Sequence, residues 1–393
     1  MKLADAFSLI RNGASIKQYD NAVGIPITRI ETIANRVVDR SKCGYADIFD
    51  IEKYQDYVLQ DGDILMSHIN SVQHLGKTAL YSKKDGEVLI HGMNLLVLRP
   101  KREMLEPNYA YIALNSLKFL RQLPRITQKS VNQASFSVND LKQTDIDVPS
   151  LSKQKEIAHN VMQIDRMITN RQQELSVVDE LVKSRFVEMF GDPVTNPMGW
   201  KTASIRDTSE LISDGPFGSN LKSSHYVDDG IRVIRLGNIG AGKFLDDDKA
   251  YISEEHYKTL KKYTCHAGEI VIGTLGEPNL RACLIPDDIV VSVNKSDCVH
   301  FIPNADILNN IYACAYLNTD GALQLAQGSL HGQTRSRIAM SQVAALPIML
   351  PPITIQNQFA DFVQQVDKSK LAVQQSIETL QTLKAKLMQD YFS

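Results

Sequence analysis

Residues 145–190 read DIDVPSLSKQKEIAHNVMQIDRMITNRQQELSVVDELVKSRFVEMF, and residues 347–392 read PIMLPPITIQNQFADFVQQVDKSKLAVQQSIETLQTLKAKLMQDYF. The two stretches align without a gap at a constant offset of 202 residues. Eleven aligned positions are identical, which is hard to reach by chance on one ungapped diagonal. The identical pairs are Ile146/Ile348, Pro149/Pro351, Gln154/Gln356, Ala158/Ala360, Val161/Val363, Gln163/Gln365, Asp165/Asp367, Gln172/Gln374, Gln173/Gln375, Leu181/Leu383 and Phe190/Phe392. A repeat of this kind predicts one structural unit present twice.

The segments before each of these stretches also repeat, though more loosely. GIPITRIETI at 24–33 matches GIRVIRLGNI at 230–239, and YVLQDGDIL at 57–65 matches YTCHAGEIV at 263–271. The predicted order is therefore globular half, helix, globular half, helix. The expected domains are a first half (1–148), a central helical region (149–191), a second half (192–348) and a C-terminal helical region (349–393).

Apolar residues recur along both helical regions in alternating steps of four and three, the spacing of a coiled-coil seam. The predicted seam residues are Ile157, Val161, Ile164, Ile168, Leu175, Val178 and Val182 in the first helix, and Phe359, Val363, Val366, Val373, Ile377, Leu380 and Leu387 in the second. Ser152 and Thr354 are the expected N-caps, and Gly191 is expected to end the first helix. So long an amphipathic helix needs a partner, and its matched twin is the natural one. The alternative is two separate surface helices.

The two halves are predicted to have a mixed α/β (α+β) fold. Short apolar runs separated by glycine and polar turns indicate strands. The expected strands are 63–66, 88–90, 95–98 and 270–272, and the expected helices are 108–119 and 309–318.

Composition sets the protein class. The 393 residues are 43% hydrophobic and 22% charged, with a formal net charge of −2, so total charge does not indicate a nucleic-acid partner. No apolar stretch is long enough to span a membrane, and the first residues do not resemble a secretory signal. Five scattered cysteines without a CxxC pair fit reduced thiols. A cytoplasmic protein of two or three domains is expected.

The sequence contains no complete catalytic motif. Gly237–Lys243 satisfies GxxxxGK, but Phe244 stands where a phosphate-binding loop needs Ser or Thr, and acidic residues at 246–248 would repel phosphate. A turn between strands is expected there. The histidines lack metal-ligand spacing, and no methyltransferase or hydrolase signature is present. The chain is therefore predicted to be non-catalytic, with no metal or cofactor of its own.

Local charge is more informative than the total. A first acid-free window (107–139) and a second (321–360) occupy equivalent places in the two halves. Each combines basic side chains with amides and hydroxyls, the groups that contact phosphates and base edges. The DNA-binding candidates are Lys118, Arg121, Arg125, Gln128, Lys129, Asn132 and Gln133 in the first window, and His331, Gln333, Arg335 and Arg337 in the second. A solvated basic face without a ligand is the alternative.

The whole chain resembles the specificity (S) subunit of type I restriction–modification systems. The resemblance is carried by VPSLSKQ at 148–154, LPPITIQ at 350–356 and RFVEMFGDP at 185–193, supported by Trp200 and the Gly-Asp-Ile-Leu run at 62–65. It implies two target-recognition domains separated by two long helices that form an antiparallel coiled coil. It also implies that each domain reads half of a bipartite site on double-stranded DNA, and that the helices set the spacer between the half-sites.

The resemblance further implies partners that carry the chemistry. These are two modification (methyltransferase) subunits, which the helices would dock, and restriction (motor-nuclease) subunits; they would use S-adenosylmethionine, ATP and Mg²⁺, none of which this chain binds. The competing interpretation is a repeat scaffold that assembles proteins without touching DNA. The paired acid-free windows favour DNA recognition.

Overall fold

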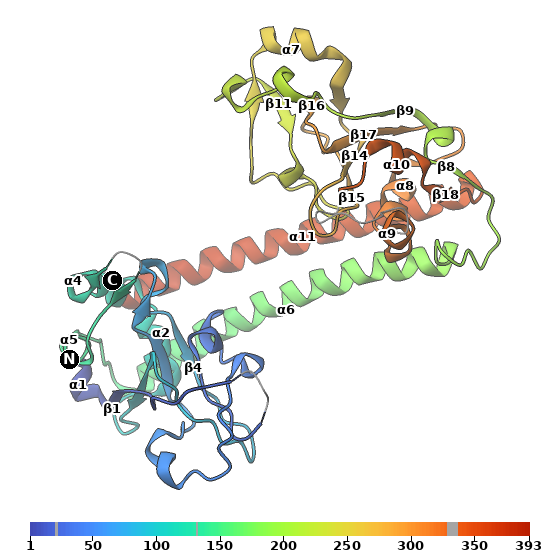
Figure 1. Cartoon of the computed structure of the whole chain (residues 1–393). Coiled ribbons are helices and arrows are strands. Elements are labelled where there is room, and N and C mark those ends of the chain that lie inside the picture. Colours follow the sequence, from blue (N-terminus) through green and yellow to red (C-terminus); the bar gives the residue numbers. More distant parts are fainter. Residues whose placement is uncertain (20–22, 131–132, 328–336) are drawn as a thin grey trace. The chain divides into compact units, whose positions relative to one another are not determined.

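The computed structural model describes residues 1–19, 23–130, 133–327 and 337–393 (Figure 1). The chain divides into two compact units, the first made of Met1–Gln172 with Gln375–Ser393 and the second of Gln173–Gln374. Each unit therefore combines one globular half with parts of both long helices.

Each half is built on a four-stranded antiparallel sheet with the same strand order. The order is β1-β5-β2-β4 in the first half and β9-β17-β14-β15 in the second. The strands are β1 (Phe7–Asn12), β2 (Ile64–Ser67), β4 (Thr78–Leu80), β5 (Leu95–Pro100), β9 (Ser209–Ser213), β14 (Ile270–Gly273), β15 (Arg281–Leu284) and β17 (Cys298–Pro303). β2 and β14 are buried along their whole length, as expected for their apolar runs.

Short helices of matching position pack on these sheets in both halves. In the first half they are α1 (Leu3–Ala6), α2 (Pro107–Leu114), α3 (Leu117–Leu120), α4 (Leu123–Ile126) and α5 (Val138–Lys142). In the second half they are α8 (Asn310–Leu317), α9 (Asp320–Gln327) and α10 (Met340–Ala345). The second half also has a two-stranded antiparallel sheet of β8 (Thr202–Ser204) and β18 (Pro347–Met349). Tyr109 of α2 and Tyr312 of α8 are buried in the two main cores.

The outer parts of the two halves differ. The second half adds a five-stranded sheet, in the order β10-β12-β11-β16-β13, and the helix α7 (Glu254–Leu260). Its strands are β10 (Tyr226–Val227), β11 (Ile231–Ile234), β12 (Tyr251–Ile252), β13 (Thr264–His266) and β16 (Val291–Asn294). The described part of the first half has isolated bridges and short 3-10 turns at the corresponding place. It also has a small three-stranded sheet of β3 (Ile69–Asn70), β7 (Ala134–Ser135) and β6 (Gln128–Lys129).

Two 40-residue helices follow the halves, α6 (Leu151–Phe190) and α11 (Ile353–Phe392). Both start before the expected N-caps Ser152 and Thr354, so that prediction was wrong. In α6 the cap is Ser150, whose Oγ accepts from Lys153 N at 3.4 Å, and in α11 the first helical acceptor is Pro352 O, which accepts from Gln356 N at 3.2 Å. The side chains of Gln154 and Gln356 also donate to the carbonyls of Pro149 at 2.7 Å and Pro351 at 2.8 Å. α6 ends as expected at Gly191, whose φ of +81° favours glycine.

The two helices run antiparallel to each other within each unit. In the first unit, Asn160 Nδ2 of α6 donates to Tyr391 Oη of α11 at 3.0 Å, near opposite ends of the two helices. In the second, Lys370 Nζ lies 2.6 Å from an Asp179 carboxylate oxygen. The seam residues Ile157, Val161, Ile164, Phe359, Val366 and Ile377 are buried, and Ile168, Leu175, Val178, Val182, Val363, Val373, Leu380 and Leu387 are half-buried.

A repeated set of polar bonds fixes each half to the start of a long helix. The buried Gln154 side chain accepts from Glu106 N at 2.8 Å and donates to Met104 O at 2.8 Å. Its twin Gln356 accepts from Asn309 N at 2.9 Å and donates to Ile307 O at 3.0 Å. One amide thus holds the backbone at the N-terminus of α2, and the other does the same at α8.

Two further predictions of secondary structure need correction. The expected helix 108–119 breaks at Asn115 and Ser116, because Ser116 Oγ accepts from Phe119 N at 3.2 Å and starts α3 as a new helix. The expected strand 88–90 is not a strand; Ile90 makes only isolated bridges to Ile27 and Val58. The helix expected at 309–318 is α8.

Candidate nucleic-acid interface

Among the basic candidates of the first acid-free window, Lys118 lies on α3, Arg121 directly after α3, Arg125 on α4 and Lys129 on β6. Lys118 pairs with Asp147 at 3.0 Å, a carboxylate outside the window. Arg121, Arg125 and Lys129 are exposed and make no ion pair with any residue that the structure describes. Guanidinium and ammonium groups without a carboxylate partner are free to contact phosphate oxygens. Three of the four predicted cations are therefore exposed and without an ion partner among the described residues.

The amide candidates of this window lie on the small three-stranded sheet. Gln128 is exposed on β6, and Gln133 is exposed just before β7. Gln133 O accepts from Ser130 N at 2.8 Å and from Ser130 Oγ at 2.9 Å, which closes the β6–β7 turn. Asn132 lies outside the described residues.

Most candidates of the second acid-free window, namely His331, Gln333 and Arg335, lie outside the described residues. Arg337 is described and forms an ion pair: its guanidinium lies 2.7 Å from a carboxylate oxygen of Asp297 in the β16–β17 turn. Burial raises the pKa of the nearby Asp214, and the charge of Arg337 opposes that rise. Asp147 and Asp297, the carboxylates that pair with candidate cations, therefore lie outside the acid-free windows, at positions that no local sequence pattern indicates.

Both windows are anchored to the same place on their sheets. Phe136 N donates to His68 O at 3.2 Å, immediately after β2, and Ile338 N donates to Thr274 O at 3.0 Å, immediately after β14. Phe136 and Ile338 are separated by the repeat offset of 202, and both side chains are buried. The connection that follows β2 or β14 thus lies beside the window in each half. Sequence reasoning missed this connection, because its length differs between the halves.

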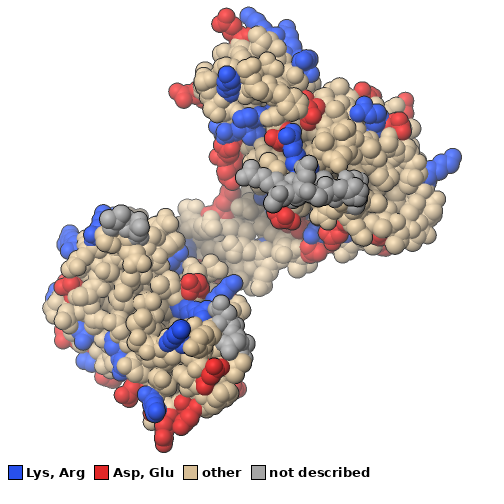
Figure 2. Space-filling model, in the orientation of Figure 1, with Lys and Arg blue, Asp and Glu red and all other residues tan. Residues whose placement is uncertain are grey.

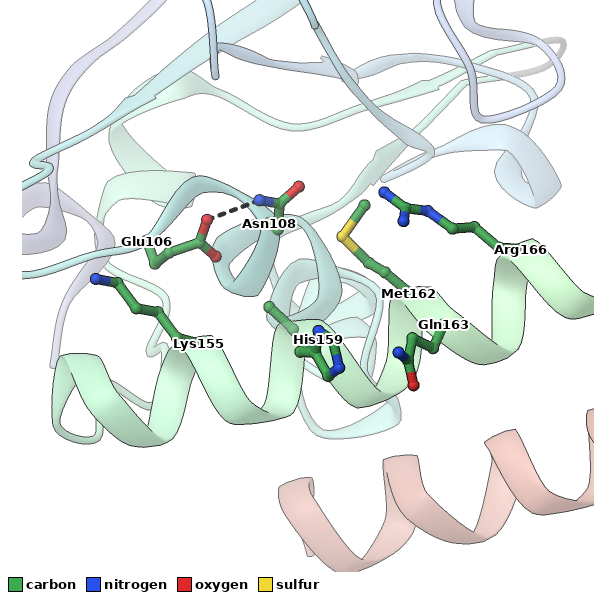
Figure 3. A pocket seen from close by; sticks show the side chains of 8 residues that line it. Glu106, Asn108, Lys155, His159, Met162, Gln163 and Arg166 are labelled. Atoms are coloured by element: carbon green, nitrogen blue, oxygen red, sulfur yellow. Dashed lines mark hydrogen bonds between the residues drawn. The ribbon is translucent and has the colours of Figure 1, made fainter.

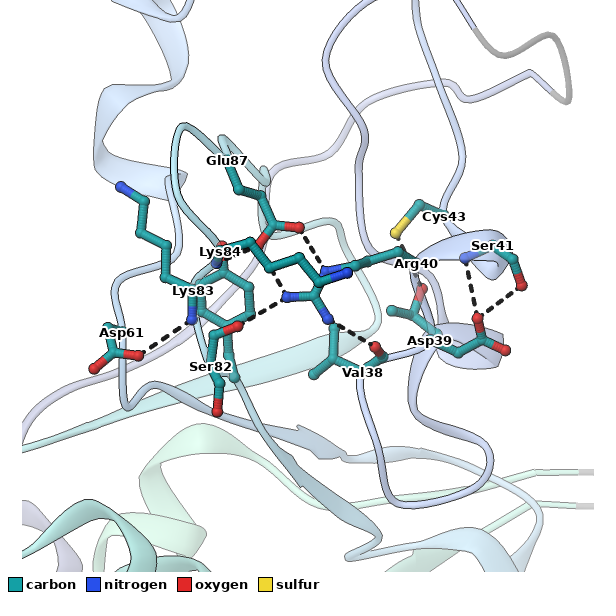
Figure 4. A network of polar contacts seen from close by, with 12 residues as sticks. Val38, Asp39, Arg40, Ser41, Cys43, Asp61, Ser82, Lys83, Lys84 and Glu87 are labelled. Carbon is teal, nitrogen blue, oxygen red and sulfur yellow. Dashed lines mark hydrogen bonds and ion pairs between the residues drawn. The ribbon is translucent and has the colours of Figure 1, made fainter. Parts of the chain in front are cut away.

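Other cations of the first half are committed to internal contacts. Arg40 forms a two-bond pair with Glu87, at 2.6 and 2.9 Å, and also donates to the carbonyls of Ser82 and Val38 (Figure 4). The hydrogen bond from Arg40 lowers the pKa of Glu87 to about 2. Tyr81 Oη donates to the same carboxylate at 2.9 Å. This network stabilises the fold and leaves little of the Arg40 guanidinium for a ligand.

Charge of both signs is spread over the surface. On the face drawn in Figure 2, Lys and Arg side chains alternate with Asp and Glu over both units. The distribution agrees with the near-neutral total, so any affinity for a polyanion depends on local groups such as Arg121 and Arg125.

The glycine-rich run Gly237–Lys243 forms a tight turn, as expected, and no phosphate-binding loop. Gly240 N donates to Lys243 O at 2.9 Å, and Ile239 bridges Phe244. Asn238 Nδ2 donates to the carbonyls of Leu245 and Asp248, each at 2.8 Å. A P-loop continues into a helix whose N-terminus faces the phosphates, whereas this turn continues into an acidic loop and β12.

A cleft of about 280 Å³ lies between α6 and the N-terminus of α2 (Figure 3). Lys155, His159 and Arg166 line it from α6. The Glu106 carboxylate is occupied there, accepting from Tyr109 N at 2.6 Å and Asn108 Nδ2 at 2.7 Å. No group of three metal-ligating side chains occurs in the part of the chain that the structure describes.

The buried titratable groups belong to the cores. Burial lowers the pKa of His68 and of His91 to about 4, and burial also lowers the pKa of His300 against the pull of Glu269, 2.7 Å away. All five cysteines are buried and unpaired, and burial raises their pKa. Neutral buried groups of this kind pack the interior and offer no nucleophile.

Comparison with known proteins identifies the family. The model of the type I restriction modification DNA specificity domain matches residues 1–179 and 197–382. The chain belongs to this family. The predicted family is thereby confirmed, and so is the fold class of two tandem α/β domains with two long antiparallel helices.

Individual relatives agree with the family match. The chain is 37% identical over 209 residues to the putative type I restriction enzyme MjaX specificity subunit of Methanocaldococcus jannaschii, covering 53% of this chain and 49% of that protein. It is 26% identical over 194 residues to the EcoKI specificity subunit of Escherichia coli K12, covering 47% and 41%. The chain thus spans about half the length of these curated relatives.

Solved structures share the fold. The S subunit of a type I restriction–modification system from M. genitalium superposes with a TM-score of 0.56 at 13% identity, covering 100% of this chain and 95% of that one. A chain from a study of complex assembly and conformational transition of the type I R-M system gives 0.57 at 17% identity, covering 100% and 96%. No helix within the described residues is long and apolar enough to cross a membrane.

Proposed function

We propose that this chain is the non-catalytic DNA-recognition subunit of a type I restriction–modification complex. Residues 1–148 and 192–348 act as two target-recognition domains, each reading one half of a bipartite site on double-stranded DNA. Residues 149–191 and 349–393 set the length of the unread spacer. The observation that carries the proposal is the doubled frame: one sheet order, one window anchor and one buried glutamine occur in both halves of a chain from a DNA-specificity family.

Phosphate contacts in the first domain are assigned to Arg121, Arg125 and Lys129. They lie in a stretch of 33 residues without an acid, and their charges are not neutralised by described neighbours. Contacts to phosphate position a protein on the duplex, while contacts to base edges supply its sequence preference. Lys118 contributes less, because Asp147 already neutralises it.

The partners in this proposal are two modification subunits, which dock on the helical regions, and restriction subunits. S-adenosylmethionine, ATP and Mg²⁺ act in those partners, and the complex works in the cytoplasm. Support for docking comes from apolar side chains that the helices leave exposed: Val177 is 67% exposed, Leu181 49% and Leu371 61%. Exposed apolar groups on a helix are typical of a surface that another protein covers.

A repeat scaffold that assembles proteins without DNA is the second candidate function. The exposed apolar residues of α6 and α11 would serve it equally well. The unpaired cations in the first acid-free window favour the DNA-binding function, because a scaffold gives them no role.

The salt dependence of DNA binding tests the proposal. With the partner subunits present, Arg121→Ala and Arg125→Ala together should weaken binding and flatten the log–log salt slope by about 0.9 for each phosphate that the variant no longer neutralises. Lys53→Ala, an exposed cation of the same half outside the window, is the matched control and should leave the slope unchanged. A complex that binds no duplex DNA, or a slope insensitive to the double variant, contradicts the proposed surface.

A further inference from the structure

The small sheet β3-β7-β6 presents one row of side chains away from the core. Ile69, Ser135 and Gln128 are directly opposite one another in the register, so their side chains share a face. Ala134, the neighbour of Ser135, points to the other face and is buried, as is Phe136 two residues on. The Gln128 row therefore lies on the face opposite Ala134; Gln128 is exposed on the edge strand, and Ile69 and Ser135 are half-buried.

We propose that this small sheet is the base-reading element of the first recognition domain, and that Gln128 reads an adenine in the major groove. The inference rests on the proposed function and adds the element and the residue that supply specificity. A two-stranded β-ribbon, such as the pair of β6 and β7, fits the major groove, which is about 12 Å wide. A glutamine amide can bond both N6 and N7 of adenine, and this pair of bonds distinguishes adenine from the other bases.

The charges around Gln128 suit a strand inserted between two phosphate backbones. Arg125 precedes it on α4 and Lys129 follows it on β6, and neither pairs with a described acid. The whole stretch from 107 to 139 lacks carboxylates, so nothing in the window itself repels DNA. The amide of Gln128 makes no hydrogen bond with the described part of the chain, which leaves both of its polar atoms for a base.

The backbone that carries Gln128 is fixed from both sides. Before it, Thr127 Oγ1 donates at 2.7 Å to the carbonyl of Leu123, the first residue of α4. After it, the Ser130–Gln133 bonds close the turn into β7, and Phe136 N holds β7 to the end of β2. A reading side chain on a supported strand is positioned more accurately than one on a free loop. Arg121, directly after α3, and Arg125, on α4, would then contact phosphate while β6 reads bases.

The motif methylated by the assembled complex tests the inference. Gln128→Ala should lower discrimination for adenine at one position of one half-site by about ten-fold, as expected when a pair of hydrogen bonds to the base is removed, and leave the other half-site unchanged. Gln128→Glu should shift preference at that position toward cytosine, whose N4 amino group donates to a carboxylate. Gln55→Ala, another exposed glutamine of the same half, is the control and should change neither half-site.

The outcomes separate this inference from the proposed function. A wild-type complex with a bipartite motif that neither Gln128 variant alters overturns the reading role of the small sheet and leaves the proposed function standing. A wild-type complex with no bipartite motif contradicts the proposed function itself. Because the Gln128 side chain is exposed and makes no hydrogen bond with described residues, both variants should melt at the wild-type temperature. A lowered melting temperature would indicate a structural role of this side chain and count against the inference.

Discussion

The inner and outer parts of the two halves have diverged to different degrees. The inner parts match bond for bond: Tyr109 Oη donates to Asp147 O at 2.9 Å, and Tyr312 Oη donates to Met349 O at 3.0 Å. Phe392 stacks on Tyr109, and its repeat equivalent Phe190 packs edge-on against Tyr312. The outer parts share little, since only the second half carries the sheet β10-β12-β11-β16-β13 within the described residues.

This difference indicates what each part is for. The repeated bonds attach a half to the ends of the two long helices, and that attachment has to be the same twice if the halves are to be presented in equivalent ways. Side chains that read different bases have no such constraint. The shared frame ends at Gly13 and Gly215, equivalent positions just after β1 and β9 where the backbone packs closely against another segment. A Cβ added to Gly13 would lie 2.1 Å from Gly92 O, and one added to Gly215 would lie 2.4 Å from Lys295 O.

The largest expected effect comes from breaking the shared frame. Gln154→Ala and Gln356→Ala should each lower the free energy of unfolding by about 3 kcal/mol, because each leaves one part-buried N–H and two carbonyls without their partner. Chemical denaturation measures the change. Gln173→Ala, on an exposed position of α6, is the control and should cost under about 0.5 kcal/mol. Unequal effects at the two twins would mean that the frames are not energetically equivalent.

The pH dependence of stability also distinguishes the two halves. His68 and His91 have a pKa of about 4 when folded, below the usual 6.5, so the unfolded chain binds more protons between these values. Stability should therefore fall as pH drops from about 6.5 to 4, and His68→Gln with His91→Gln should flatten that fall. His300→Gln should flatten it less, because Glu269 partly offsets the burial of His300. Denaturation midpoints measured across this pH range test the prediction. Equal flattening by the double variant of the first half and by His300→Gln of the second would contradict the expected difference between the halves.

The smallest effect concerns the ion pairs between the helices. Lys370 and Asp179 are 28% and 62% exposed, so water screens their attraction. Asp179→Ala should cost at most about 0.5 kcal/mol, with a similar small cost for Asp165→Ala, which removes the pair with Lys384. Exchanging the partners, as Asp179→Lys with Lys370→Asp, should restore stability. A cost of several kcal/mol from either single variant would mean that these pairs, and not the apolar seam, hold the helices together.

Much of the frame could be predicted from the sequence because its signals are local. The 3–4 spacing predicted both long helices, and the apolar run at 63–66 predicted β2. The N-caps were misplaced because Ser150 and not Ser152 caps α6, and because α11 begins directly after Pro352. The expected helix 108–119 missed its break because Asn115, beside the Ser116 cap, donates to Thr78 Oγ1 on a distant strand.

The candidate site was predictable only in part. The absence of acids marked a stretch in which Arg121 and Arg125 have no ion partner among the described residues, but it could not show that Asp147 reaches Lys118 or that Asp297 reaches Arg337. The small sheet escaped prediction because its strands are two residues long and have no periodicity of their own. Long-range pairing, which no local pattern encodes, creates both the ion pairs and the sheet.

The most direct test of the account exchanges one recognition domain. Residues 192–348 are replaced by the equivalent segment of another member of this family, and the motif methylated by the complex is read by sequencing modified bases in host DNA. If each half reads its own half-site on a shared frame, one half of the motif should change and the other half and the spacer should stay as in the wild type. A motif in which both halves change together would contradict independent reading by the two domains.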